Sequence, residues 1–175
     1  MTRLGHQEFI LAGTGGQGLV VAGVLLAEAA IREGRNVVQT QSYGIATRGG
    51  LSFAEVIIDD DEILFQQVRR PHCVLALSEE AVKKFEIWPG KGVPMLYDTT
   101  LAAVRKADNF FGHEFTRHAG DAGGVNILAL ATLTVFTQAV GLQSLESAVR
   151  GRFKGKSLES NLRLLAVGEK LAAGT

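Results

Sequence analysis

Cysteine is almost absent from this sequence, since Cys73 is the one thiol among 175 residues. A single thiol cannot form a disulfide within the chain, nor can it alone ligate an iron–sulfur cluster or a structural zinc ion. We therefore expect a reducing compartment, the cytoplasm, and a chain that carries no cluster of its own. Cys73 lies inside an apolar run, which predicts a small buried side chain rather than a nucleophile.

An excess of either charge is also missing, because 18 lysines and arginines balance 18 aspartates and glutamates. No basic block indicates nucleic acid or an anionic membrane as a partner. Residues 1–8 are polar and show no signal-peptide apolar segment. The longest apolar stretch, Val125–Leu142, contains Asn126 and several threonines, so a buried helix is expected there rather than a membrane span.

The apolar runs and their breakers predict an α/β domain. Glu8–Ala12 is expected as a strand, Leu19–Glu33 as a helix that ends at Gly34, and Asn36–Gln41 as a second strand that starts a parallel sheet. Further strands are expected at Leu51–Ile58, His72–Ser78, Val93–Tyr97 and Asn109–Phe115, and helices at Glu79–Phe85, Val125–Val140, Ser144–Phe153 and Ser157–Ala173. Residues 1–175 should form a single domain with a Rossmann-like, mostly parallel sheet, helices on both faces and a helical C-terminal part.

Two of these helices, Leu19–Glu33 and Val125–Val140, are apolar on nearly every face. A surface helix of a monomer has a polar face. Two interpretations stay open: both helices lie in the centre of the domain, or part of each is covered by another chain.

The first motif, Gly13-Thr14-Gly15-Gly16-Gln17-Gly18, places G-x-G-x-x-G between an expected strand and an expected helix. Its glycines permit a tight turn and a close approach of the backbone to a ligand. Free N–H groups and the positive end of the helix dipole favour a phosphate or diphosphate there. The alternative is a tight turn that binds no ligand.

The identity of that ligand is constrained by the end of the second strand. An NAD site would have an acidic residue about 20 positions after the glycines, and Gln39, Thr40 and Gln41 occupy that region. The sequence therefore supports a phosphate-bearing ligand more than NAD.

The second motif, Ser42–Gly50 (SYGIATRGG), follows the second strand and is expected at the same sheet edge as the glycine loop. Arg48 can pair bidentately with a phosphate, and the ring of Tyr43 could stack on a base or a pantetheine arm. The alternative is a surface arginine in a glycine-rich connector.

The remaining polar residues predict no catalytic set. Ser78 is expected either to reach the ligand edge or to cap the helix that follows it, and Asn126 to make a local hydrogen bond. His113, His118 and Asp121 match no metal-ligand spacing. We therefore predict no catalytic and no metal-binding residue in this chain, a profile typical of a binding subunit.

These motifs carry a resemblance. GTGGQG, QTQSYG followed by RGG, and HCVLALS together resemble the gamma subunit, or gamma domain, of 2-oxoacid:ferredoxin oxidoreductases over essentially the whole chain. QTQSYG is most similar to the 2-oxoglutarate type. Pyruvate, branched-chain and indolepyruvate enzymes stay open as alternatives.

The resemblance implies an oxidoreductase that works only with alpha and beta subunits, and a delta subunit is a further candidate partner. Those partners would carry thiamine diphosphate, Mg²⁺ and 4Fe–4S clusters, electrons would pass to ferredoxin, and the acyl group would pass to coenzyme A. This chain would contribute the coenzyme A-binding domain. Carried over by motif, residues Gly13, Thr14, Gly15, Gly16, Gln17 and Gly18 would hold a diphosphate, and Ser42, Tyr43 and Arg48 would line the nearby cleft.

One departure from the family pattern concerns Ile45 and Ala46, which stand where the family often has proline and glutamate. Any polar contact of that carboxylate is absent here, which bears on the substrate subtype. Two other hypotheses remain: an autonomous NAD- or FAD-dependent oxidoreductase, and a non-catalytic subunit that holds its partners together.

Overall fold

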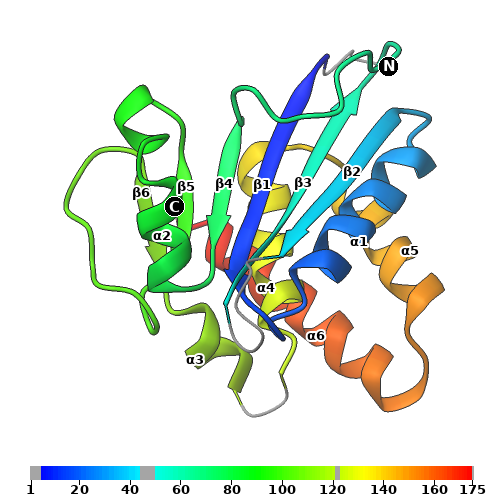
Figure 1. Ribbon diagram of the computed structural model, residues 1–175. Coiled ribbons are helices and arrows are strands. Elements are labelled where there is room, and N and C mark those ends of the chain that lie inside the picture. The colour runs from blue at the N-terminus through cyan, green and yellow to red at the C-terminus, as the bar shows by residue number, and fades with distance from the viewer. Residues whose placement is uncertain (1–4, 44–49, 121–122, 175) are drawn as a thin grey trace.

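The computed structural model describes residues 5–43, 50–120 and 123–174, which build a six-stranded sheet with helices on both faces (Figure 1). The strands are β1 Gln7–Thr14, β2 Asn36–Tyr43, β3 Leu51–Asp59, β4 Cys73–Ala76, β5 Met95–Asp98 and β6 Phe110–His113. The helices are α1 Leu19–Arg32, α2 Glu79–Phe85, α3 Phe115–Ala119, α4 Val125–Thr137, α5 Leu142–Arg152 and α6 Gly155–Ala172, with a short 3₁₀ turn at Pro89–Lys91. The expected α/β class and the expected mostly parallel sheet are confirmed.

The strand order is β2-β3-β1-β4-β5-β6. β1, β4, β5 and β6 pair in parallel, whereas β3 pairs antiparallel with both β1 and β2. β2 therefore runs in the same direction as β1 but does not pair with it. The sequence had instead predicted that these two strands start a parallel sheet. The connection after β2 is too short for a helical crossover, so β3 returns beside β2 as a hairpin partner.

The two faces of the sheet bury different sets of side chains. Along β1, Phe9 and Leu11 point into the larger cluster beneath α1, α4, α5 and α6. Ile10 and Ala12 point to the opposite face, into the smaller cluster that contains α2 residues. All four residues of β4 are buried because helices cover that strand on both faces.

The apolar helix α4 is central, which settles for this helix the question left open by the sequence. Every residue from Asn126 to Thr134 is buried. Gly168 of α6 permits this packing, because a Cβ there would lie 2.3 Å from the carbonyl oxygen of Leu128. α1 differs, since Ile31 near its end is 61% exposed. No helix in the described ranges is long and apolar enough to cross a membrane.

The short helix α3 was not expected, because its sequence falls partly in a segment interpreted as a loop. Its first turn is held by Asp98, whose buried carboxylate accepts hydrogen bonds from the backbone N–H and the hydroxyl of Thr116. A carboxylate from the end of β5 thus satisfies a helix-start N–H group that would otherwise lack an acceptor.

Candidate functional site

The two motifs meet at one edge of the sheet, where β1 and β2 both end. Thr14 at the end of β1 pairs with Leu51, and Tyr43 at the end of β2 pairs with Ser52, so both strands finish beside the start of β3. The N–H of Gly15 donates to the carbonyl of Gly50 at 3.0 Å. The glycine loop and the second motif are therefore in contact, as the sequence predicted.

The side chain of Gln17 folds back into its own loop. Its Oε1 accepts the N–H of Thr14 at 2.7 Å, and its Nε2 donates to the carbonyl of Leu77 at 2.9 Å. Leu77 follows β4, so Gln17 joins the ends of two neighbouring strands. Gln17 was expected to hold a diphosphate. Its Oε1 and Nε2 each make a hydrogen bond within the chain, and its contact with a diphosphate stays a prediction.

Some backbone N–H groups of the glycine loop already donate hydrogen bonds, and others are available to a ligand. Those of Thr14, Gly15 and Gln17 have acceptors within the chain. In the described part of the chain, the N–H groups of Gly16 and Gly18 have no acceptor. Gly15 and Gly16 are exposed, and Gly18 precedes α1 as an N-cap residue that supplies no side-chain hydrogen bond. The surface offered to an anion is thus smaller than the whole motif and centres on Gly16, Gly18 and the start of α1.

Asn126 fixes the far side of this loop. Its Nδ2 donates to the carbonyl of Gly18 at 2.9 Å, across 108 residues of sequence. Gly18 has a φ of 75°, and a Cβ there would lie 2.5 Å from that same nitrogen, so the position needs glycine for two reasons. The expected local bond of Asn126 is wrong: this buried amide ties the start of α4 to the start of α1.

The second motif is described only at its ends. Ser42 is exposed on the sheet face opposite α1, in register with Phe53. Tyr43 closes β2 at the expected edge. The side chain of Tyr43 and the whole of Arg48 lie outside the described residues, so their contribution to the cleft stays a prediction.

The other polar candidates have structural roles. Ser78 caps α2, since its hydroxyl accepts the N–H of Ala81 at 3.2 Å, which confirms the capping interpretation. Burial raises the pKa of the Cys73 thiol to about 12, so this side chain is a buried apolar group. Burial lowers the pKa of His113, which lies at the end of β6. Among the residues described, no group of His, Cys, Asp and Glu side chains is arranged to hold a metal ion.

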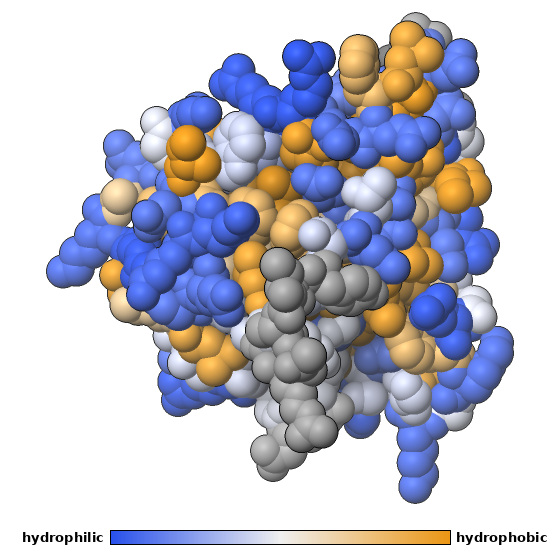
Figure 2. Space-filling model, in the orientation of Figure 1, coloured by the Kyte–Doolittle hydropathy of each residue, from blue (hydrophilic) through white to orange (hydrophobic). Residues whose placement is uncertain are grey.

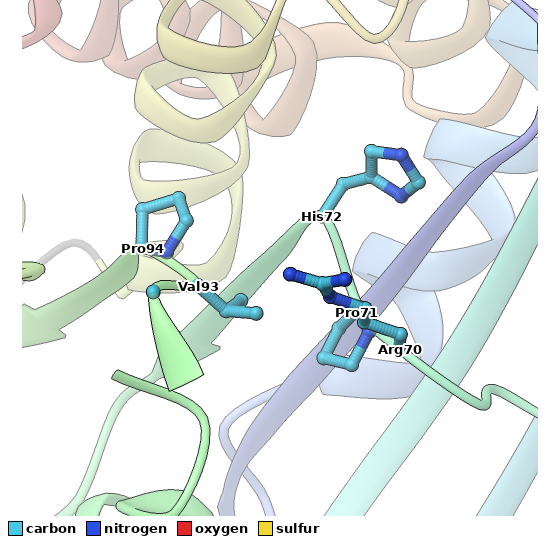
Figure 3. A pocket seen from close by; sticks show the side chains of 6 residues that line it. Arg70, Pro71, His72, Val93 and Pro94 are labelled. Carbon is cyan, nitrogen blue, oxygen red and sulfur yellow. The ribbon is translucent and has the colours of Figure 1, made fainter. Parts of the chain in front are cut away.

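A pocket of about 320 Å³ lies at the opposite edge of the sheet, between the segments that precede β4 and β5 (Figure 3). It is lined by Arg70, Pro71, His72, Gly92, Val93 and Pro94. The His72 ring points away from Val93 and Pro94, and its Nδ1 accepts the N–H of Glu8. The charged side chain that lines this pocket is Arg70, and the pocket is separate from the glycine-loop edge.

Known proteins resemble this chain in sequence and in fold. The sequence model of the family described as pyruvate ferredoxin/flavodoxin oxidoreductase matches residues 8–170. The 2-oxoglutarate synthase subunit KorC of Archaeoglobus fulgidus is 38% identical over 159 residues, which are 90% of this chain and 83% of that protein.

Solved structures extend the likeness to the fold. The gamma subunit of a keto/oxoacid ferredoxin oxidoreductase from Geobacter sulfurreducens matches with a TM-score of 0.85 and 33% identity, over 97% of this chain and 98% of that one. The 2-oxoglutarate:ferredoxin oxidoreductase of Magnetococcus marinus, solved with 2-oxoglutarate, coenzyme A and succinyl-CoA bound, matches with a TM-score of 0.86. At 19% identity, over 98% of this chain and 32% of that one, it shows a shared fold.

Proposed function

This chain belongs to the pyruvate ferredoxin/flavodoxin oxidoreductase family, and we propose that residues 1–175 are the gamma-type domain of a 2-oxoglutarate:ferredoxin oxidoreductase. The observation that carries this proposal is the end-to-end likeness to a 2-oxoglutarate synthase subunit and to a solved gamma subunit. Enzymes for pyruvate, branched-chain 2-oxoacids or indolepyruvate are the alternatives within the same family.

The division of chemistry between subunits is the one that the resemblance to 2-oxoacid:ferredoxin oxidoreductases implies, and the content of this chain agrees with it. Its one cysteine is buried, with a pKa raised to about 12, which suits neither cluster ligation nor nucleophilic attack. In this proposal thiamine diphosphate, Mg²⁺ and iron–sulfur clusters belong to alpha, beta or delta partner subunits, and ferredoxin receives its electrons from them. The 2-oxoacid would be decarboxylated on the partners as well.

Coenzyme A is the ligand we assign to the glycine-loop edge. It carries a diphosphate, and the available N–H groups of Gly16 and Gly18 stand at the positive end of the α1 dipole. The Magnetococcus marinus enzyme, which shares this fold, holds coenzyme A, so this compound is the one to test first. In this proposal the backbone binds the anion, Gln17 braces the loop, and Ser42, Tyr43 and Arg48 line the cleft.

The test places a negative charge on the loop of the assembled complex. Gly15 is exposed, so Gly15→Asp adds a carboxylate beside the available N–H groups. A charge-assisted contact is worth about 1.5–3 kcal/mol, and tenfold in affinity corresponds to about 1.4 kcal/mol. Calorimetry should therefore show coenzyme A binding weakened roughly ten- to hundredfold, while the KM for 2-oxoglutarate stays unchanged.

Gly90→Asp is the matched control, because Gly90 lies in an exposed turn and a Cβ there would meet nothing within 4 Å. It should leave coenzyme A affinity at the wild-type value. Equal affinity of the Gly15 variant and the wild type would remove the ligand from this loop and leave the chain as an assembly subunit. The choice of 2-oxoacid is tested separately, by ferredoxin reduction with 2-oxoglutarate against pyruvate.

A further inference from the structure

A segment far from the glycine loop has an unusual arrangement of charge. Residues 60–70, which we call the strap, join β3 to β4 and cross the amino end of β1 along the top of Figure 1. Their sequence, DDEILFQQVRR, is acidic at the start, apolar in the middle and basic at the end. Along this rim Figure 2 shows hydrophobic side chains beside hydrophilic ones.

The apolar centre of the strap is turned outward. Leu64 is 78% exposed and Phe65 is 67% exposed. Among the large apolar side chains of the described residues, Leu64 is the most exposed. The guanidinium carbon of Arg69 lies 5.4 Å from the centre of the Phe65 ring, so a cation–π contact holds this ring in place. Two adjacent apolar side chains that are exposed to solvent are typical of an interaction surface.

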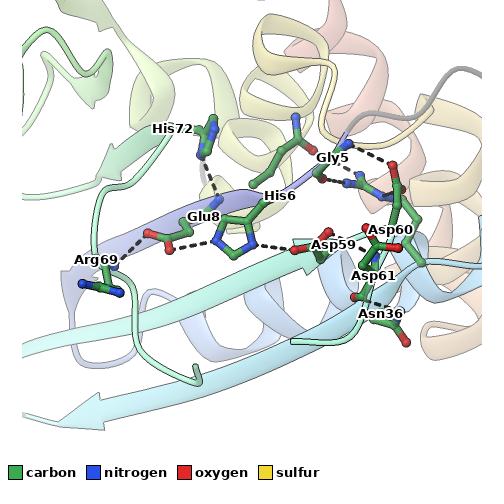
Figure 4. Close-up of polar contacts among 11 residues, drawn as sticks. Gly5, His6, Glu8, Asn36, Asp59, Asp60, Asp61, Arg69 and His72 are labelled. Carbon is green, nitrogen blue, oxygen red and sulfur yellow. Dashed lines mark hydrogen bonds and ion pairs between the residues drawn. The ribbon is translucent and has the colours of Figure 1, made fainter. Parts of the chain in front are cut away.

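The strap is rigid because both of its ends are anchored (Figure 4). At its end, the N–H groups of Arg69 and Arg70 donate to one carboxylate oxygen of buried Glu8, each at 2.7 Å. At its start, Asp60 accepts the N–H of Gly5 and pairs with the guanidinium of Arg35 at 2.9 Å. A surface that is already ordered loses little conformational entropy when it binds a partner.

The order of charges along the strap indicates which partner it fits. If a second strap runs antiparallel and is centred on Gln66, the acidic start of each strap lies opposite the basic end of the other. Glu62 and Arg70 are both exposed and would form such a pair twice, once on each side of a two-fold axis. This pattern is self-complementary, as a contact between identical subunits requires.

We propose that the strap is a two-fold contact between two copies of this chain, with Leu64 and Phe65 at its centre and Glu62 against Arg70 of the second copy at each end. The surface is small compared with the roughly 800 Å² per partner of a stable interface. The self-association is therefore weak for the chain alone, and salt weakens it further because its end pairs are exposed.

The decisive experiment uses two charge reversals in the full chain, followed by sedimentation over micromolar to millimolar concentrations. Glu62→Arg and Arg70→Glu should each lose self-association, because each homodimer then opposes like charges twice. An equimolar mixture of the two variants should associate again, because both end pairs are then of opposite charge. This rescue is specific to an antiparallel contact between two copies.

The controls separate this contact from a loss of folding or another occupant. Phe65→Asp should abolish self-association, whereas Ile87→Asp, at an apolar side chain that is 56% exposed outside the strap, should not. All variants should keep the wild-type melting temperature. A monomeric wild-type chain at every concentration, or a mixture that stays monomeric, would overturn the proposal. So would strap variants that release other subunits of the complex while self-association persists.

Discussion

The crossing of α4 and α6 at Gly168 leaves no room for a side chain, and Gly168→Ala tests that contact. The added Cβ would lie 2.3 Å from the carbonyl oxygen of Leu128 and 2.7 Å from the Cβ of Ala131. Since the closest atom belongs to a backbone, no rotamer change relieves the overlap, and the helices must separate. Overpacking of this kind costs about 1–3 kcal/mol, and the upper end applies to a rigid neighbour.

Two smaller effects accompany the overlap. Separation of the helices weakens the hydrogen bond from the Thr132 hydroxyl to the Gly168 carbonyl, which is 3.0 Å long in the wild type. This loss costs about 1 kcal/mol of stability. Alanine regains about 0.8–1 kcal/mol of helix propensity. The free energy of unfolding should thus fall by roughly 3 kcal/mol, which lowers Tm by roughly 6–12 °C in a chain of this length.

Chemical denaturation and calorimetry of the full chain measure this change, with Gly151→Ala as the matched control. Gly151 lies on the exposed side of α5, and its added Cβ would meet only the tip of the flexible Arg32 side chain at 3.3 Å. That variant should gain about 0.5–1 kcal/mol. If both alanine variants shift stability in the same direction, the close approach of α4 and α6 is refuted.

Three further predictions concern single side chains. Thr134→Val should raise the free energy of unfolding by about 1 kcal/mol in urea denaturation, because the buried Thr134 hydroxyl has no hydrogen-bond partner in the described ranges. Arg35→Met should cost about 3 kcal/mol in the same assay, because the buried guanidinium bonds Asp60, Gln7 and the carbonyls of residues 5 and 139; a neutral result would show that these four contacts do not stabilise the fold. The hydrogen bond with Glu8 raises the pKa of His6 above 6.5, so its contribution is complete below that pH and lost as pH rises through the folded pKa. The stability difference between wild type and His6→Gln should therefore shrink as the pH rises above 6.5, and a growing difference would contradict the direction of the shift.

The fold was predictable where the signal is local. α2 was expected at Glu79–Phe85 and is found there, because Ser78 is a capping residue and the helix is amphipathic over a short span. The place of β3 in the strand order was harder to predict from the sequence, because strand order depends on which strands become neighbours in the folded chain. α3 depends on the Asp98 carboxylate, which lies at the end of β5 and outside the helix. The sequence around α3 therefore gives no local signal of that contact.

The candidate site shows the same division. The glycine spacing predicted the turn, and the position of the second motif after the second strand predicted that the two motifs share one edge of the sheet. The sequence could not show that the Gln17 side-chain amide forms hydrogen bonds with Thr14 and with Leu77, which is 60 residues away. Nor could it show that Asn126 forms a hydrogen bond with Gly18. A buried asparagine in the first turn of an otherwise apolar helix was the available signal for the second contact, but its partner lies in another part of the chain.

The brace formed by Gln17 has a consequence for how quickly a ligand is captured. Because the glycine loop is held in shape by its own amide side chain, it would not have to fold around the diphosphate that we propose it binds. Stopped-flow traces of the complex should then show one phase whose rate rises linearly with ligand concentration, without a plateau from a preceding rearrangement. Gln17→Ala should convert this behaviour into a slower, saturating approach to equilibrium.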